Sequence, residues 1–260
     1  MKPRRDCVRA AGSQLTLAVE FVDGSSRFAP GTLRDPTAVS QPDSGLPTRR
    51  RFVVASVLSV YLLAACGKKP PAVRGTPVAP GATVLALGDS LTFGTGAPPE
   101  AAYPTVLAKL TGWAVVNAGV PGHTSAQALE RLPGLLAEHQ PALVIVSIGG
   151  NDLLRRGDET VLRDNLRRTL AAVRAAGAQA LLVAVPRPTL SAQVTGSLDD
   201  HPLYAEIAAE AGVPLHAEGW STVLADDRLK SDTIHGNAAG YEAFARGLLG
   251  TLQAAGFLGP

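Results

Sequence analysis

The stretch Thr83-Val84-Leu85-Ala86-Leu87-Gly88-Asp89-Ser90 decides the fold class of this chain. A short apolar run that is followed at once by a turn signal is typical of a strand buried in a parallel sheet. Gly88 permits a tight turn after the strand, which would place Ser90 at the N-terminus of a helix. The runs read as strands are Thr83–Leu87, Ala114–Val116, Leu143–Ile148, Ala180–Val185 and, more weakly, Val213–Leu215.

The segments between these runs have apolar residues at three- and four-residue spacing, which indicates amphipathic helices. The helices are predicted at Tyr103–Leu110, Ser125–Glu138, Glu159–Ala176, Pro202–Ala211 and about Asn237–Ala255. Alternating strands and helices predict a single α/β domain, residues 82–260, with a parallel sheet. Right-handed crossovers then favour a three-layer α/β/α sandwich.

Polar, glycine-rich clusters follow three of the predicted strands. They are Gly88-Asp89-Ser90, Asn117-Ala118-Gly119 and Gly149-Gly150-Asn151-Asp152. In open parallel sheets, ligands bind beyond the carboxyl ends of the strands. The three clusters therefore predict a site at one edge of the sheet.

Ser90 is the candidate nucleophile, and a serine hydroxyl needs a base to become reactive. His235 has a carboxylate, Asp232, three residues before it, and this spacing puts both side chains on one face of a turn. Such a pair fixes the imidazole tautomer and leaves Nε2 to take the serine proton. The alternative is that Ser90 only caps a helix, the commonest role of serine at such a junction.

Acyl transfer also needs hydrogen-bond donors that face the developing oxyanion. The Ser90 amide, the Gly119 amide and the Asn151 side chain follow the first three strands and fit this need. The alternatives are a plain turn glycine and an Asx turn. Four other histidines are weaker candidates for the base, namely His123 in a glycine-rich loop near the site, and His139, His201 and His216.

Four blocks of the sequence resemble the GDSL/SGNH hydrolase family. They are Gly88-Asp89-Ser90-Leu91-Thr92-Phe93-Gly94, Asn117-Ala118-Gly119-Val120, Gly149-Gly150-Asn151-Asp152 and Asp232-Thr233-Ile234-His235. The resemblance implies the SGNH fold, with a flavodoxin-like, five-stranded parallel sheet. It implies Ser90 as nucleophile, Asp232 and His235 as its partners, and an oxyanion hole of the Ser90 amide, the Gly119 amide and Asn151. It implies no cofactor and no metal.

Within this family, the stretch from Asn117 to Asp152 most resembles proteobacterial arylesterases and the periplasmic thioesterase/lysophospholipase. We therefore expect a small-molecule or lipid ester as substrate, with thioesters and lysophospholipids as further candidates. His123 departs from the pattern, since close relatives often have Asp there, and this bears on loop structure or substrate fit. The loop Pro186–His201 has no aromatic residue, which favours short acyl groups. Two alternatives stay open: an O-acetyl esterase or acyltransferase of envelope polysaccharide, and a catalytically silent binding lipoprotein.

Charge and motifs argue against other classes. Residues 67–260 have 15 Lys and Arg against 17 Asp and Glu, so the body lacks the basic excess of a nucleic-acid binder. The sequence lacks the Gly-x-Ser-x-Gly elbow of α/β-hydrolases, and its first turn lacks a dinucleotide fingerprint. Asp199-Asp200 and Asp226-Asp227 have no His or Glu at ligand spacing, so no metal site is predicted.

Residues 46–66 are typical of a secretory signal. Arg49-Arg50-Arg51 precedes an apolar run, Phe52–Ala65, that is too short to span a bilayer. The arginines also resemble a twin-arginine export signal. Leu63-Ala64-Ala65-Cys66 resembles a lipoprotein lipobox, which implies acylation of Cys66. The alternative is a buried helix that ends at a chance cysteine.

The remaining N-terminal segments follow from this assignment. Residues 1–45, which include Cys7, are an extension or the product of a start codon placed too early. Residues 67–81 are a proline-rich tether reaching up to ~3.1 Å per residue. Gly67 stands where Asp would retain a lipoprotein in the inner membrane. The expected location is the periplasmic face of the outer membrane of a Gram-negative cell, with membrane attachment through Cys66.

Overall fold

The computed structural model describes residues 73–187 and 198–258, and it confirms the predicted α/β class. Five parallel strands form one sheet in the order β2-β1-β3-β4-β5, which is the flavodoxin-like order. The strands are β1 Thr83–Gly88, β2 Ala114–Gly119, β3 Leu143–Ser147, β4 Gln179–Val183 and β5 Leu215–His216. Each predicted strand is present, with its ends shifted by at most three residues.

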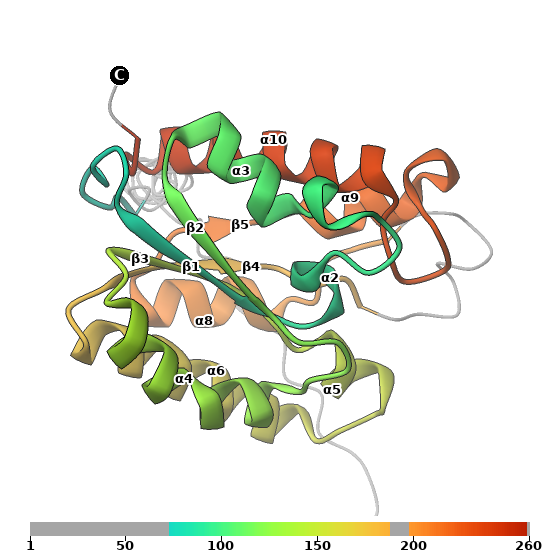
Figure 1. The fold of residues 1–260 in the computed structure, drawn as a ribbon. Helices are drawn as coiled ribbons and strands as arrows, with labels where there is room; N and C mark the ends of the chain where they lie inside the picture. Colours follow the sequence, from blue (N-terminus) through green and yellow to red (C-terminus); the bar gives the residue numbers. More distant parts are fainter. Residues whose placement is uncertain (1–72, 188–197, 259–260) are drawn as a thin grey trace, which may run out of the picture. The chain divides into compact units, whose positions relative to one another are not determined.

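Helices cover both faces of the sheet, as the sandwich prediction requires (Figure 1). One layer contains α3 Tyr103–Thr111, α9 Gly219–Ala225 and α10 Ala238–Ala254, and the other contains α4 Ser125–His139, α6 Glu159–Ala175 and α8 Leu203–Ala211. Side chains of β1 alternate between the layers: Val84 and Ala86 pack with the first, and Leu85 and Leu87 with the second. This period of two places apolar groups on both faces and makes the sheet the centre of the core.

The pattern of apolar residues did not delimit the short helices, because they contain too few residues to display a period. The start of one of them at Ser90 was expected from the turn after Gly88. The short helices are α2 Ser90–Phe93, α5 Gly150–Leu154, α9, and the 3₁₀ turns Pro99–Ala101 and Asp227–Leu229. Two of them, α2 and α5, begin inside the glycine-rich clusters that follow β1 and β3. These two short helices therefore contribute to the predicted site.

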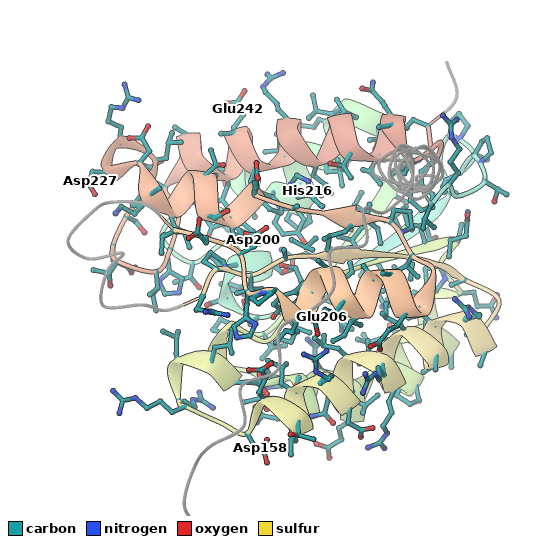
Figure 2. All side chains as sticks on the ribbon, turned by 180° about the vertical axis from the view of Figure 1, so that it is seen from behind. Asp158, Asp200, Glu206, His216, Asp227 and Glu242 are labelled. Atoms are coloured by element: carbon teal, nitrogen blue, oxygen red, sulfur yellow. The ribbon has the colours of Figure 1, made fainter. Side chains whose placement is uncertain are left out.

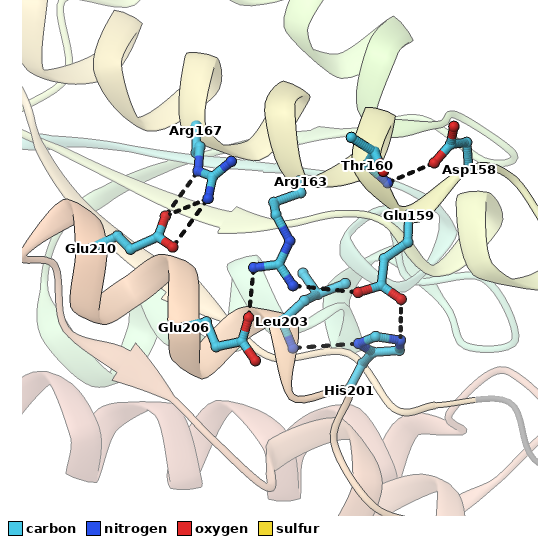
Figure 3. Close-up of polar contacts among 9 residues, drawn as sticks. All are labelled: Asp158, Glu159, Thr160, Arg163, Arg167, His201, Leu203, Glu206 and Glu210. Carbon is cyan, nitrogen blue, oxygen red and sulfur yellow. Dashed lines mark hydrogen bonds and ion pairs between the residues drawn. The ribbon is translucent and has the colours of Figure 1, made fainter. Parts of the chain in front are cut away.

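His201 takes part in a polar network that joins α6 to α8 (Figure 3). Arg163 bridges Glu206 at 2.6 Å and Glu159 at 3.3 Å, and His201 Nε2 lies 3.6 Å from the same Glu159 carboxylate. Burial lowers the pKa of the His201 ring, although the Glu159 carboxylate opposes this effect. His201 is therefore a contact between two helices and lies outside the predicted site.

Part of the predicted tether is fastened to the body. The Gly75 amide donates to the Ala255 carbonyl at 2.8 Å, and the Val78 amide donates to the Phe257 carbonyl at 2.7 Å. The folded part of the chain thus begins before residue 82, because the proline-rich stretch pairs with the segment after α10. Within the described ranges, no helix has both the length and the apolar character needed to cross a membrane.

His216 is the most deeply buried histidine of the described chain, between α10 and the sheet (Figure 2). Its Nδ1 lies 2.8 Å from Thr251 Oγ1, its ring packs edge-on against Phe244, and its Nε2 is buried without a partner. Burial lowers the pKa of the ring from 6.5 to about 4, and Asp200 only partly offsets this. The neutral ring is favoured in the folded protein, so its contribution to stability is complete above pH 6.5 and is lost toward pH 4.

We expect the free energy of unfolding to fall more steeply in the wild type than in His216→Asn between pH 7.5 and 4.5. Asn retains a polar group near the Thr251 hydroxyl but does not titrate. The expected difference is about 2–3 kcal/mol, from urea unfolding at several pH values. Asp89 and His201 titrate in both proteins, so the difference isolates His216. The same pH dependence of the unfolding free energy in both proteins would show that titration of His216 does not cause the fall in the wild type.

Candidate active site

The turn between β1 and α2 presents the Ser90 hydroxyl. Asp89 is the N-cap of α2, because its Oδ1 accepts a hydrogen bond from the Leu91 amide at 3.0 Å. Ser90 is the first residue of the helix, and its side chain is not used for capping. The N-cap of this helix is therefore Asp89, and Ser90 does not have the capping role that the sequence left open.

Ser90, His235 and Asp232 lie in one hydrogen-bonded series. Ser90 Oγ is 2.9 Å from His235 Nε2, and His235 Nδ1 is 2.8 Å from Asp232 Oδ2. The Asp232 Oδ1 atom accepts from the amides of Ile234 and His235 at 2.8 and 2.9 Å. The carboxylate thus binds the backbone of its own turn with one oxygen and the imidazole with the other. The structure brings together the three side chains that the sequence singled out.

The charge of Asp232 is stabilised by this turn. Burial acts to raise the pKa of the carboxyl, but the hydrogen bonds from the His235 ring and from the two amides outweigh it. The pKa therefore lies below its ordinary value of 3.8. Asp232 is an anion at neutral pH, as an acceptor for the imidazole N–H must be.

Asn237 fixes this turn to α10. Its Oδ1 caps the helix by accepting from the Gly240 amide at 3.0 Å. Its Nδ2 donates to the carbonyls of Arg228 and Lys230 at 2.8 and 3.1 Å. The backbone before His235 is consequently held by a residue two positions after it, which limits movement of the ring.

The three predicted oxyanion donors lie at the same edge of the sheet, but two of them point to protein acceptors. The Gly119 amide donates to Asn117 Oδ1 at 3.0 Å. Asn151 Nδ2 donates to the His123 carbonyl at 3.0 Å and, more weakly, to Asp89 Oδ2 at 3.4 Å. The Ser90 amide lies in the first turn of α2, where helix amides lack partners within the helix. A substrate oxygen would have to compete with these acceptors.

Two glycines at the site are required by close packing. A Cβ on Gly119 would lie 2.1 Å from the Phe93 nitrogen, so only glycine lets α2 approach the end of β2. Gly149 has φ of 114°, and a Cβ there would come within 2.3 Å of Tyr204 Oη. Tyr204 in turn donates to the Ile148 carbonyl at 2.8 Å and holds the turn that leads to Asn151.

Sequence reasoning gave no separate role to Asp89 or Asp152. Asp89 is 3% exposed, and burial raises its pKa to about 6 against the opposing bond from Leu91. Asp152 binds the start of α4, accepting from the Ser125 amide at 2.8 Å and its hydroxyl at 2.6 Å. For Asp89 the available signal was its position, since an Asp directly before a helix is a typical cap.

The histidines other than His235 lie in different surroundings. His139 and His201 contact glutamates on helices, and His216 contacts Thr251. His123 reaches the site through its backbone carbonyl, while its Nδ1 is buried without a partner. His235 is thus the histidine that the structure places next to Ser90.

The comparison with known families decides the family of the chain. Residues 86–243 match the sequence model of the GDSL-like Lipase/Acylhydrolase family. The chain belongs to this family. All four motif blocks lie within the matched region.

Individual relatives agree with the family. Thioesterase 1/protease 1/lysophospholipase L1 of Escherichia coli K12 is 37% identical over 158 residues, which cover 60% of this chain and 76% of that protein. Esterase TesA of Pseudomonas aeruginosa is 40% identical over 111 residues, covering 41% and 55%. The crystal structure of TesA has a TM-score of 0.60 at 30% identity, covering 66% of this chain and 99% of that one. The protein is a carboxylic-ester hydrolase of this family.

Proposed function

We propose that the protein hydrolyses carboxylic esters through a covalent acyl-enzyme on Ser90. The observation that carries this proposal is the series Ser90 Oγ–His235 Nε2–Asp232, with distances of 2.9 and 2.8 Å. Ser90 Oγ attacks the ester carbonyl carbon while its proton passes to His235 Nε2. The C–O bond to the alcohol then breaks, and the alcohol leaves with that proton. Water, deprotonated by His235, releases the acid and restores Ser90.

We propose that the amides of Ser90 and Gly119 and the Asn151 side chain stabilise the oxyanion. Ser90 begins α2 directly after β1, Gly119 ends β2, and Asn151 is the second residue of α5 after β3, so all three lie at the carboxyl edge of the sheet. Asn151→Ala is expected to lower kcat by about 10²–10³ with a small change in KM, as for other oxyanion donors. A loss confined to KM would assign Asn151 to substrate binding instead.

Titration with an organophosphonate tests the proposal as a whole. The protein should hydrolyse p-nitrophenyl acetate or butyrate, and one equivalent of phosphonate should abolish turnover. Mass spectrometry of the digested adduct should place the phosphonyl group on Ser90. An adduct on Ser125, Ser147, Ser221 or Ser231 would contradict the assignment.

We propose short acyl groups as the preferred substrates. The argument rests on the composition of the loop after β4, of which residues 188–197 lie outside the described ranges. Phe93, three residues after Ser90, and Ile234, directly before His235, are 53% and 40% exposed, and we expect them to offer an ester some apolar contact. Thioesters and lysophospholipids, named for the E. coli relative, are further candidates. An acetyl-to-palmitoyl series tests the preference, and a maximum at twelve carbons or more would overturn it.

We propose export and lipid attachment through Cys66, on the periplasmic side of the outer membrane. The support is the run of arginines, the short apolar segment and the lipobox-like Leu63–Cys66, all outside the described residues. Labelling with a palmitate analogue in cells should be lost in Cys66→Ala. Retained labelling in that variant would refute lipid attachment at Cys66.

A further inference from the structure

Helix α10 connects the active-site edge of the sheet to the opposite edge (Figure 1). It begins at Ala238, three residues after His235, and ends at Ala254. Its 17 residues at ~1.5 Å each give a length of about 25 Å. The segment that follows α10 is therefore about 25 Å from the Ser90–His235 pair.

The N-terminal arm, residues 73–80, is fastened at this far end. Gly75 and Val78 donate to the carbonyls of Ala255 and Phe257, which directly follow α10. Gly75 also lies against the Phe257 ring, where a Cβ would come within 2.2 Å. Gly75 is thus held at the end of the molecule that faces away from Ser90.

Residues at the amino ends of the strands hold the arm as well. The side-chain amide of Gln179, the first residue of β4, accepts from the Thr76 amide at 2.7 Å and donates to the Thr76 carbonyl at 3.0 Å. Trp113, just before β2, donates from Nε1 to the Val78 carbonyl at 3.4 Å. Ser90 follows the carboxyl end of β1, so arm and site lie at opposite edges of the same sheet.

The length of chain between Cys66 and the arm limits how closely the Ser90 edge can approach the bilayer that holds Cys66. Gly75 is nine residues after Cys66, and a fully extended chain spans ~3.3–3.6 Å per residue, or about 30 Å here. For the Ser90 edge to face the bilayer that holds Cys66, the axis of α10 would have to stand along the membrane normal, with Gly75 about 25 Å above the surface. Nearly full extension of those nine residues removes most of their conformational freedom.

We infer that a lipid anchor at Cys66 holds the Ser90 edge away from the anchoring bilayer, so that the substrates are esters arriving from the aqueous phase rather than lipids of that bilayer. This inference rests on the proposed ester hydrolysis and anchoring. It adds a substrate class to the proposed function, because the anchor would decide which esters can reach Ser90, whatever their fit to the site.

The test couples the full chain carrying Cys7→Ser, whose single remaining thiol is Cys66, to maleimide lipid in phosphatidylcholine vesicles. Two substrates share one reacting group: soluble 4-methylumbelliferyl butyrate, and a butyryl coumarin ester with a hexadecyl chain that holds it in the vesicles. A second protein has 20 Gly/Ser residues inserted between Lys69 and Pro70, and a control has the same insertion after Pro260.

Coupling should leave the rate on the soluble ester within about twofold for all three proteins. On the embedded ester, the protein with the longer tether should be at least about tenfold faster than the native tether and the C-terminal control, because flexible linkers of this length remove the limit on reach. Equal rates on the embedded ester for all three would overturn the inference. Failure of the uncoupled protein on the soluble ester would instead refute the proposed function.

Discussion

Replacing Ser90 with Ala is expected to lower kcat on p-nitrophenyl butyrate by a factor of about 10⁴–10⁶. Loss of the nucleophile from a serine–histidine–aspartate series has effects of this size, and the residual rate comes from the oxyanion donors and binding. His235 would keep its bond to Asp232 but would have no hydroxyl at 2.9 Å from Nε2 to deprotonate. Covalent labelling by phosphonate should disappear together with turnover.

Ser221→Ala is the matched control for this variant. Ser221 is another buried serine, 3% exposed, and lies on α9 outside the Ser90–His235–Asp232 series. The Ser221→Ala variant should retain the wild-type kcat and full labelling by phosphonate. Both variants should keep the thermal unfolding temperature of the wild type within a few degrees. If Ser90→Ala kept more than about a hundredth of the activity, Ser90 could not be the nucleophile.

The fold could be predicted because its long helices display an apolar period and its strands are short, continuous apolar runs. The run 83–87 has no helical periodicity and reads as a strand, and the structure makes it β1, paired on both sides. Helices α2 and α5, of four and five residues, could not be found in this way. They occur where glycines and caps set the chain path, and such local geometry leaves no apolar period.

The site residues could be located because parallel strands bring their carboxyl ends to one edge. Their hydrogen bonds could not be predicted, since these depend on side-chain orientation. No pattern in the sequence indicates that Asn117 accepts from the Gly119 amide, or that Asn151 donates to Asp89 and to the His123 carbonyl. The arm at Gly75 was likewise read as tether, because its contacts are with the far end of the chain.

Replacing Asp232 with Asn is expected to lower kcat/KM by up to about 10⁴. The Asn Oδ1 can still accept from the amides of Ile234 and His235, so the turn should persist. The amide nitrogen would then face His235 Nδ1, now 2.8 Å from a carboxylate oxygen, and would donate to it. This favours the tautomer with the proton on Nε2, which faces Ser90 Oγ and cannot accept the serine proton.

Measuring this variant across a pH range shows whether the loss is general. The Asp232 carboxylate would stabilise the imidazolium that forms as Ser90 Oγ attacks, so its removal should lower kcat/KM throughout the range and not only at one end of it. Asp89, whose burial raises its pKa to about 6, titrates in both proteins and does not account for a difference between them.

Asp227→Asn is the charge-matched control for this profile. It removes the same charge from a side chain that is 95% exposed and paired with Lys230, and its profile should match the wild type. Kinetics on one activated ester between pH 5 and 9 measure all three proteins. Near-wild-type kcat/KM in Asp232→Asn across this range would mean that Asp232 does not act on His235. Equal losses in both variants would assign the effect to long-range charge, because Asp232 contacts the His235 ring and Asp227 contacts Lys230.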